Sequence, residues 1–412
     1  MAQIGAAPRK LLYVQASGGG GSVISLLLLV KHLDPDRYRP FVLFCQPSSY
    51  ASEFTAMGAQ VLYLDPRIDA RPWIGPNQKS RNSNHRTRRT YRSIAPLIRL
   101  LKRDLPRALE VARIARDVGA DLVHSNVSPS ADRASIIGAS MARCRHVCHV
   151  RFMQGPSRFL DMPLSHLVDR YVYISEAVSR QFRSDTGIGA HKGSVIYNPF
   201  EFGKPPARET ARGLRRQLGV ADGESLIANV GRLVPWKGQD VFLRAFANVV
   251  HHHPEARAII VGGAKQTDAG RDFEARLHRL AEELNLGDRV IFTGHRPDVA
   301  DVMAAADFVV HSSCEPEPFG RVVMEAIVLE RPIIATAAGG VLEMVRSGVT
   351  GTLVPPGDSA AMAQAISGLL GNMSRANAMA RRARAVSCTR FAAATHVKAI
   401  EAVYEQVLGP QC

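Results

Sequence analysis

Residues 314–343 read C-E-P-E-P-F-G-R-V-V-M-E-A-I-V-L-E-R-P-I-I-A-T-A-A-G-G-V-L-E. The run just before them, residues 308–313, is short and apolar, which predicts a buried strand. A loop follows, and residues 321–329 carry apolar side chains at helical spacing. Glu317 is therefore expected in the loop at the carboxyl end of a strand, and Glu325 on the helix after it. Ligands bind at that edge of an open parallel sheet, so both carboxylates are candidate binding groups.

The rest of the chain alternates in the same way between short apolar runs and segments long enough for a crossover helix. This alternation predicts doubly wound parallel sheets. Asn198-Pro199 and Pro205-Pro206 interrupt the alternation, so we place a domain boundary near residue 200. We expect strands at residues 10–16, 40–45, 60–64, 121–125, 146–150, 170–174 and 193–197 in the first domain, and at residues 225–230, 258–261, 290–293, 308–311, 333–335 and 351–354 in the second.

Glu317 and Glu325 stand eight residues apart, Pro-Phe-Gly follows the first of them directly, and Gly-Gly-x-x-Glu lies downstream. This segment resembles the signature of the group 1 (family 4) nucleotide-sugar glycosyltransferases. The resemblance implies that Glu317 binds the donor sugar and that Glu325 binds the ribose hydroxyls. The backbone amides of Phe319 and Gly320 would meet phosphate oxygens at the start of the helix. The alternative is two surface carboxylates that flank an ordinary helix.

The resemblance also implies a fold and a mechanism. Enzymes of this family are retaining and have the GT-B fold, in which two doubly wound Rossmann-like domains face each other across a cleft. We expect an acceptor-binding domain at residues 1–200, a donor-binding domain at residues 201–385, and a terminal helix within residues 386–412 that crosses back to the first domain. The donor is a nucleoside-diphosphate sugar, and the acceptor is a glycan or a lipid-linked molecule. No cofactor and no metal are expected.

Residues 231–238 follow the first strand of the second domain and resemble the family's G-R-x-x-x-x-K-G element. The guanidinium of Arg232 can hold a diphosphate as a fork, and Lys237 adds a mobile positive charge. The resemblance makes these two residues and Glu317 the candidate catalytic group. Arg296, after the third strand of this domain, lies where the family cradles the base. The alternative for Arg232 and Lys237 is a pair of solvated cations beside a turn.

A glycine run at residues 18–21 separates the first strand from a helix expected to begin at Val23. Gly19 and Gly20 would let backbone N–H groups approach a phosphate. The position of the run resembles the glycine loop of the family's first domain, which lies beside the donor phosphates and the acceptor.

On the acceptor side, Asn126 occupies a position at which many family members carry a histidine. An amide can hydrogen-bond a sugar hydroxyl but cannot act as a base. His149 ends the next expected strand and is the nearest alternative imidazole. A purely structural role for His149 is the other interpretation.

The chain has 412 residues and a formal net charge of +15. Residues 67–107 hold twelve lysines and arginines against two aspartates, so the excess is concentrated there. The first part, residues 67–92, predicts a long loop, whereas apolar residues at helical spacing from Ile94 to Leu105 predict a short basic amphipathic helix. The stretch is either a flexible charged loop followed by a surface helix whose apolar side is core, or a docking surface for an anionic membrane or a lipid-diphosphate acceptor.

Other features limit the class of protein. No stretch holds the ~20 apolar residues that cross a bilayer, and the first residues lack a signal-peptide pattern. Six scattered cysteines form no disulfide framework. We therefore expect a cytoplasmic protein, and the docking interpretation of the basic stretch would give it a role in surface polysaccharide or glycolipid assembly. If the docking interpretation holds, it binds the inner face of the membrane.

Two rival functions stay open. One is a nucleotide-sugar epimerase on the same scaffold, which would need no acceptor. The other is a polyanion- or nucleic-acid-binding protein, which the net charge favours. The basic stretch, however, offers only Trp73 and Tyr91 for stacking on bases and holds no nucleic-acid motif, so we expect no nucleic-acid partner. Release of nucleoside diphosphate that depends on an acceptor would separate these functions.

Overall fold

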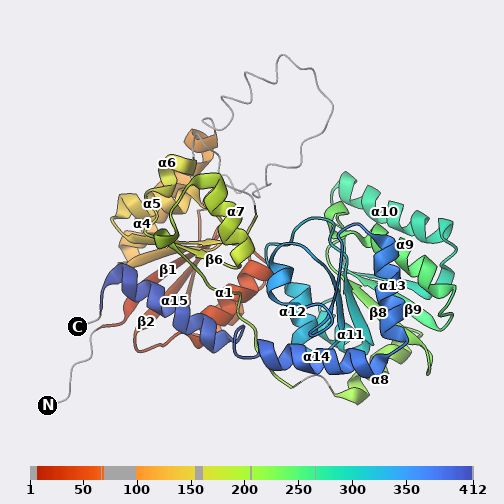
Figure 1. Ribbon diagram of the computed structural model, residues 1–412. Coiled ribbons are helices and arrows are strands. Elements are labelled where there is room, and N and C mark those ends of the chain that lie inside the picture. The colour runs from red at the N-terminus through yellow and green to blue at the C-terminus, as the bar shows by residue number, and fades with distance from the viewer. Residues whose placement is uncertain are drawn as a thin grey trace. The chain divides into compact units, whose positions relative to one another are not determined.

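The structure, a computed structural model, describes residues 7–65, 67–68, 99–153, 161–204, 207–264 and 266–410 (Figure 1). The chain divides into two units, Met1–Phe200 with Ala393–Cys412, and Glu201–Ala392. The chain thus leaves the first unit beside the boundary expected near residue 200. It returns at Ala393, later than residue 386, where the sequence places the start of the terminal segment.

The first unit is built on a parallel sheet with strand order β3-β2-β1-β4-β5-β6-β7. Its strands are short and apolar on both faces because helices cover both sides. The strands are β1 (Arg9–Gln15), β2 (Tyr38–Phe44), β3 (Gln60–Tyr63), β4 (Leu122–Ser125), β5 (Arg145–Val150), β6 (Arg170–Tyr173) and β7 (Gly193–Val195).

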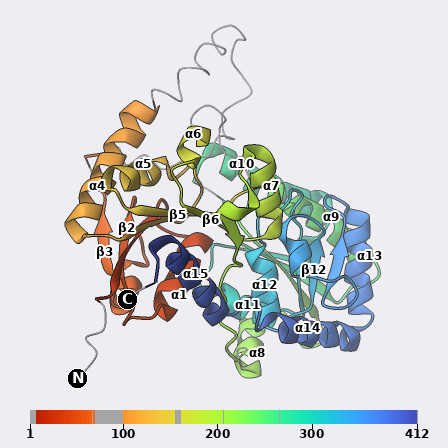
Figure 2. The same ribbon diagram turned by 60° about the vertical axis from the view of Figure 1, so that its left-hand side comes forward.

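The helices of the first unit include one from the far end of the chain. They are α1 (Gly21–His32), α2 (Ala51–Ala56), η1 (Leu100–Asp104), α4 (Leu105–Val118), α5 (Arg133–Ala142), α6 (Asp161–Ser165), α7 (Glu176–Thr186), η2 (Ala190–Lys192) and α15 (Ala393–Leu408). The terminal helix α15 lies along α1 (Figures 1 and 2). Val397, Ile400 and Tyr404 of α15 are buried in the core of this unit.

The second unit has a parallel sheet with strand order β10-β9-β8-β11-β12-β13. Its strands are β8 (Ser225–Val230), β9 (Ala256–Val261), β10 (Val290–Gly294), β11 (Phe308–His311), β12 (Ile333–Thr336) and β13 (Thr352–Val354). Its helices are α8 (Arg208–Gln217), η3 (Pro235–Lys237), α9 (Gln239–Val250), α10 (Asp268–Glu283), η4 (Gly287–Arg289), α11 (Val299–Ala305), α12 (Arg321–Val328), η5 (Gly340–Glu343), α13 (Ser359–Leu370) and α14 (Met373–Ser387).

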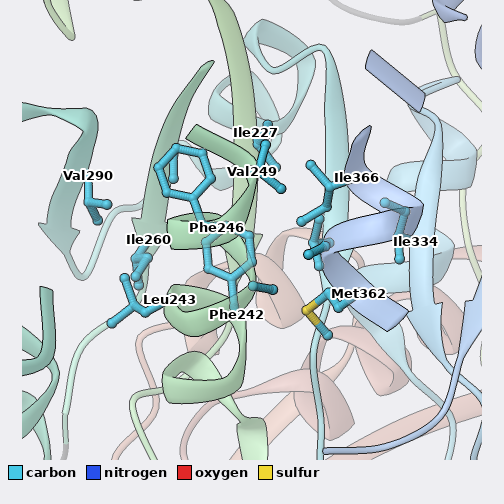
Figure 3. Packing of buried hydrophobic residues seen from close by; sticks show 14 of the residues in the cluster. Ile227, Phe242, Leu243, Phe246, Val249, Ile260, Val290, Ile334, Met362 and Ile366 are labelled. Carbon is cyan, nitrogen blue, oxygen red and sulfur yellow. The ribbon is translucent and has the colours of Figure 1, made fainter. Parts of the chain in front are cut away.

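Helix α9 forms the centre of the core of the second unit. Its Phe242 and Phe246 are fully buried between the sheet and α13, whose Met362 and Ile366 face them (Figure 3). Burying one such phenylalanine stabilises the fold by roughly 1.5–3 kcal/mol. This packing fixes α9, and α9 in turn anchors the end of the loop that follows β8.

Each sheet has one point at which the strand order reverses. In the first unit β1 lies between β2 and β4, and in the second β8 lies between β9 and β11. The connections that follow two such neighbouring strands run in opposite directions, and a crevice therefore opens at the carboxyl ends of these strands. A binding site is therefore expected at the loops that follow β1, β4, β8 and β11.

The thirteen expected strands are all present, with ends that differ by at most two residues. Helix α1 begins at Gly21 and not at Val23, because glycines 20 and 21 provide the cap and the first helical residue. The end of the short helix expected from Ile94 to Leu105 is also corrected, whereas its first residues, 94–98, lie outside the described residues. In the part of the chain that the structure describes, a π-type turn at Leu100–Asp104 continues without a break into α4.

Candidate active site

The loops that follow β8 and β11 are joined at the crevice of the second sheet. The Cys314 amide donates to the Trp236 carbonyl over 2.8 Å, and the Ser312 hydroxyl donates to the Lys237 carbonyl over 2.8 Å. The side-chain amide of Asn229, near the end of β8, donates to the Ser312 hydroxyl over 2.9 Å. These bonds hold the backbone of Lys237 at a fixed position beside the loop that carries Glu317.

Lys237 and Glu317 form an ion pair there. The Lys237 ammonium donates to Oε1 of Glu317, and its Nζ lies 4.4 Å from the centre of the Trp236 ring. The two side chains are only 15% and 8% exposed. The sequence predicts both residues at the site, and the structure brings them into direct contact.

Two further groups support the same carboxylate. His311 Nε2 lies 3.1 Å from Glu317 Oε1, and the Ser313 hydroxyl donates to that oxygen over 2.8 Å. Burial acts to raise the pKa of Glu317, but the hydrogen bond from His311 and the charge of Lys237 outweigh it and lower the pKa to about 2. Glu317 is therefore ionised at neutral pH. Neither His311 nor Ser313 was predicted as a site residue from the sequence, although His311 is the last residue of β11 and Ser313 lies two residues beyond it.

The backbone of Glu317 is held by the glycine pair downstream. The Gly340 amide donates to the Glu317 carbonyl over 2.8 Å. Gly339 has φ +65°, and a Cβ atom there would lie 2.1 Å from the same carbonyl oxygen. No side chain fits in that space, so the Gly-Gly turn is required for the position of Glu317.

Arg232 and Glu325 lie on the elements that flank the ion pair. Arg232 is exposed in the loop after β8, where Gln239 of α9 donates to its carbonyl over 3.0 Å. Glu325 lies on α12 with a side chain 33% exposed, and its carboxylate is 3.2 Å from the guanidinium of Arg321. Neither contacts Glu317 by a hydrogen bond or ion pair in the described part of the chain. Both are accessible to a ligand at this edge.

The start of α12 holds Phe319 and Gly320. The Phe319 ring is buried and packs edge-on against Phe391, with ring centres 6.0 Å apart. Gly320 is the N-cap of α12. The Phe319 side chain is thus a core group, and any contact of this pair with a ligand would come from the backbone at the helix N-terminus.

Arg296 lies farther from the ion pair. Its guanidinium binds Asp298 through two hydrogen bonds of 2.8 and 2.5 Å. It follows β10, and β9 separates β10 from β8 in the sheet. The structure therefore places Arg296 at the same edge but not beside Lys237 and Glu317.

In the first unit, the glycines after β1 differ in their surroundings. A Cβ atom at Gly18 would lie 2.0 Å from the Pro47 carbonyl oxygen, so Gly18 is needed for packing. At Gly19 and Gly20 a Cβ atom would meet nothing within 4 Å, and both residues are exposed. The open part of the loop is the part that the sequence predicts to approach a phosphate.

Asn126 and His149 are both buried beside this loop. The Asn126 amide donates to Gln15 Oε1 over 2.6 Å and accepts a 2.7 Å hydrogen bond from Arg151. Arg151 NH2 also lies 3.3 Å from His149 Nδ1. An acceptor hydroxyl would have to displace one of these bonds to reach Asn126. Arg151, which joins the two residues, was not singled out in the sequence.

His149 belongs to a buried stack of imidazoles. Its ring lies 5.5 Å from that of His124 and 6.2 Å from that of His396 on α15, in nearly parallel planes. Burial lowers the pKa of His396 to about 3 and lowers the pKa values of His124 and His149 well below their ordinary range. All three are neutral at physiological pH.

Most of the basic stretch at residues 67–107 lies outside the described residues. Its described end, from Arg99, is helical, and Leu101 and Leu105 are exposed there, by 56% and 36%. Leu109, one turn farther along, is 51% exposed. Leu101 and Leu105, the two described residues of the predicted apolar side, are therefore exposed, whereas Ala108 and Val111 of the same helix are buried. The other apolar residues of that side, Ile94, Leu97 and Ile98, lie outside the described residues. Leu101, Leu105 and Leu109 form an exposed row, which we call the leucine row.

Within the residues described above, no group of three or more histidine, cysteine, aspartate or glutamate side chains is arranged to hold a metal ion. Over the same residues, no helix combines the length and apolarity needed to cross a bilayer.

Comparison with known sequences places these features in a family. The profile described as Glycosyl transferases group 1 matches residues 211–386, and that of Glycosyltransferase Family 4 matches residues 19–202. The D-inositol 3-phosphate glycosyltransferase of Nocardia farcinica is 38% identical over 173 residues, which are 41% of this chain and 38% of the relative. The protein of the same name from Mycobacterium marinum is 36% identical over 209 residues, 50% of this chain and 43% of the relative. The matches span less than half the length of these relatives.

Comparison with solved structures confirms the fold class. The crystal structure of Anabaena Alr3699/HepE in complex with UDP and glucose gives a TM-score of 0.77 at 28% identity, covering 96% of this chain and 99% of that one. A glycosyltransferase from Rickettsia africae gives 0.78 at 19% identity, covering 98% and 99%. The likeness to the second protein concerns the fold alone. Two doubly wound Rossmann-like domains of the GT-B class are thus established for this chain.

Proposed function

Because the chain belongs to the group 1 (family 4) glycosyltransferases, we propose that it transfers a sugar from a nucleoside-diphosphate sugar to a hydroxyl group of an acceptor. One observation carries the proposal. Lys237 and Glu317 meet at the carboxyl edge of the second sheet, at the point where its strand order reverses. Nucleotide ligands of doubly wound sheets bind at such points.

The residues at this edge bind different parts of the donor. Lys237 and Arg232 bind the diphosphate and stabilise the charge that develops as it departs. Glu317, ionised and buried, accepts hydrogen bonds from hydroxyls of the donor sugar. Glu325 binds the ribose. The amides at Phe319 and Gly320 meet a phosphate at the N-terminus of α12, and Arg296 borders the base.

The reaction needs neither a metal ion nor a cofactor, because the two cations and the helix N-terminus supply positive charge at the diphosphate. It retains the anomeric configuration, and the departing phosphate takes the proton of the acceptor hydroxyl. Proton NMR of the product distinguishes the anomers, and an inverted linkage would refute the retaining mechanism.

The structure of a relative suggests the first donor to test. Alr3699/HepE was crystallised with UDP and glucose at 28% identity to this chain, so UDP-glucose heads a panel of nucleotide sugars. A true donor stabilises the folded state by mass action and so raises the melting temperature. At a free donor concentration a hundredfold above Kd, the free energy of unfolding rises by about 2.7 kcal/mol. If no nucleotide sugar shifts the melting temperature, the proposed function fails. Acceptor-dependent release of the nucleoside diphosphate then separates a transferase from an epimerase.

The acceptor is a glycan or a lipid-linked molecule, and the enzyme works at the inner face of a membrane in surface polysaccharide or glycolipid assembly. Two features support this part of the proposal. The charge excess of residues 67–107 attracts anionic lipid, and the exposed leucine row at the end of this stretch can enter the interface. The vesicle experiment described in the Discussion tests it.

A further inference from the structure

A chain of three buried polar side chains ends at the carboxylate of Glu317. The Thr336 hydroxyl lies 3.2 Å from His311 Nδ1, and His311 Nε2 lies 3.1 Å from Glu317 Oε1. Thr336, His311 and Glu317 are 1%, 3% and 6% exposed. Thr336 and His311 end the neighbouring strands β12 and β11, which pair in parallel at His311 and Ala335. The imidazole is therefore held by two strands of the sheet and not by a loop.

The direction of these hydrogen bonds follows from the charge of Glu317. Burial acts against ionisation, but His311 and Lys237 lower the pKa of this carboxyl to about 2, so at neutral pH it can only accept hydrogen bonds. His311 Nε2 therefore carries a proton. In the neutral imidazole, Nδ1 then accepts the hydrogen bond of the Thr336 hydroxyl.

Once a donor is bound, the Lys237 ammonium is no longer a partner of Glu317 only. Its ammonium donates to Glu317 Oε1 in the structure and is also the proposed partner of the diphosphate. A diphosphate carries more negative charge than one carboxylate, so it draws the ammonium away. A buried carboxylate that loses its cation is destabilised unless other donors stay on it. His311 and Ser313 are the donors that remain on Oε1.

The second carboxylate oxygen of Glu317, Oε2, differs from Oε1 in its partners. Within the described residues, Oε2 of Glu317 accepts no hydrogen bond, whereas Oε1 accepts three. We propose that His311, oriented by Thr336, is a positioning residue. It holds Oε1 of Glu317 while Lys237 engages the donor diphosphate, so that Oε2 accepts a hydroxyl of the donor sugar. This inference rests on the proposed function of the Glu317 site.

The role predicts that His311 matters for the sugar part of the donor and not for the nucleotide part. Calorimetry measures the Kd for UDP and the Kd for UDP-glucose, and the ratio of the two values reports the contribution of the sugar to binding. His311→Leu removes the donor at similar bulk and should lower the preference for UDP-glucose over UDP about tenfold or more, with the Kd for UDP changed less than about threefold. His311→Gln can still donate from the end of its side chain and should restore the preference to within about threefold.

Two more variants complete the series. Thr336→Val removes only the hydroxyl that orients the imidazole, so it should give a smaller loss than His311→Leu. His278→Leu is the matched control, because His278 is exposed in the same domain and its ring contacts that of Phe292, away from the relay. Its preference for UDP-glucose should equal that of the wild type. Equal losses of UDP and UDP-glucose affinity in His311→Leu, not rescued by His311→Gln, would reduce His311 to a packing residue and overturn the inference.

A measurement without ligand tests the same relay directly. Nitrogen-15 NMR of the full chain, with the His311 signal assigned through its loss in His311→Gln, reports which ring nitrogen carries the proton. We expect Nε2 to be protonated at pH 7, and an unprotonated Nε2 overturns the inference. If the wild type binds neither UDP nor UDP-glucose, the proposed donor is refuted, and the NMR result alone then decides whether His311 donates to Glu317.

Discussion

Among single residues, the proposed chemistry depends most on the contact between Lys237 and Glu317. Each side chain is largely buried, and each would be costly to bury alone. Lys237→Ala and Arg232→Ala should each lower turnover about a hundredfold or more, because both remove positive charge from the departing diphosphate. Steady-state kinetics on soluble, folded variants checks this. Normal turnover in either variant would remove that residue from the mechanism.

The pH dependence of activity should also differ between the Lys237→Ala variant and the wild type. In the wild type the pKa of Glu317 is lowered to about 2, with Lys237 as one of the causes, so its ionisation limits activity only near that pH. Without the ammonium, the pKa rises towards its ordinary value of about 4.3. The residual activity of Lys237→Ala should therefore fall at a higher pH than that of the wild type. Coinciding acid limbs in the two pH–rate profiles would contradict this.

The two glutamates should respond differently to substitution. Glu317→Gln keeps the shape but removes the charge at the sugar, so turnover should fall on the order of a hundredfold with little change in nucleotide affinity. Glu325→Ala should mainly weaken nucleotide binding, as the loss of a ribose contact would. Turnover and the Kd for UDP are the two measurements. The reverse pattern would exchange the assigned roles.

Lys237 and Glu317 were predicted from the sequence as separate members of the candidate site but not as a pair. Their contact depends on β8 and β11 being neighbours, and strand order is set by the packing of the whole sheet. His311 was missed for a different reason. A histidine at the end of an apolar strand is as consistent with a core group as with a functional one, and only the distance to Glu317 distinguishes them.

At the scale of elements, the strands were predictable because each is a short apolar run buried on both faces. Helix ends were less predictable. The glycines before α1 permit either a longer loop or an extra turn of helix, and α1 uses Gly21. The leucine row shows a related limit: apolar residues at helical spacing indicate a helix face but not whether that face is buried.

The Gly339-Gly340 turn is the element on which the position of Glu317 depends most directly. Gly339→Ala places a methyl group against the Glu317 carbonyl in a left-handed conformation, which costs roughly 1–2 kcal/mol for the backbone alone. We expect a lower melting temperature and at least about tenfold lower turnover. Gly368→Ala is the control, since a Cβ atom there, within α13, meets nothing within 4 Å and should raise stability by roughly 0.5–1 kcal/mol. Equal effects of the two substitutions would contradict this role of the turn.

The anchoring of α15 should make the first unit sensitive to acid. His396 of α15 stacks on His149, and burial keeps both neutral. In the unfolded chain these imidazoles take up protons near pH 6.5, so below that pH the unfolded state binds more protons. The free energy of unfolding therefore falls as pH drops from about 6.5 towards about 3, by roughly 1.4 kcal/mol per pH unit for each such imidazole.

Thermal unfolding at pH 8 and pH 5 measures this loss. His396→Asn keeps a donor for the Tyr197 carbonyl but removes one titrating group, so its melting temperature should fall less between the two pH values than that of the wild type. His191→Asn, at an exposed position of the same unit, should leave the pH dependence as it is. A pH dependence that His396→Asn leaves unchanged would mean that the stack is not its source.

At the scale of the whole molecule, the charge is uneven. Of the net charge of +15, residues 67–107 contribute ten, from twelve basic and two acidic residues. Such a concentration is a feature of partner binding more than of solubility. At its described end the stretch runs into the leucine row, in which Leu101, Leu105 and Leu109 follow one another at helical spacing with exposed side chains. Basic residues beside an exposed apolar row are the combination that binds an anionic membrane surface.

Sedimentation with vesicles of anionic lipid, at low and at high salt, tests this surface on the full chain. We expect binding at low salt that weakens at high salt, because the basic residues act over about a Debye length. Replacing Arg86, Arg88 and Arg89 by serine should weaken binding on the order of a hundredfold, at ~1 kcal/mol per charge. Leu105→Ser with Leu109→Ser should weaken it at both salt concentrations, because the apolar contribution is not screened.

The matched control removes the same charge elsewhere. Arg375, Arg381 and Arg382 are exposed on α14 of the second unit, and their replacement by serine changes the net charge as much as the first triple substitution does. If attraction came from total charge, both triple variants would lose binding equally. A loss confined to the Arg86, Arg88 and Arg89 variant places the membrane contact in the first unit, on the domain proposed to receive the acceptor. Absence of binding at any salt concentration would refute the membrane role and leave the donor site untouched.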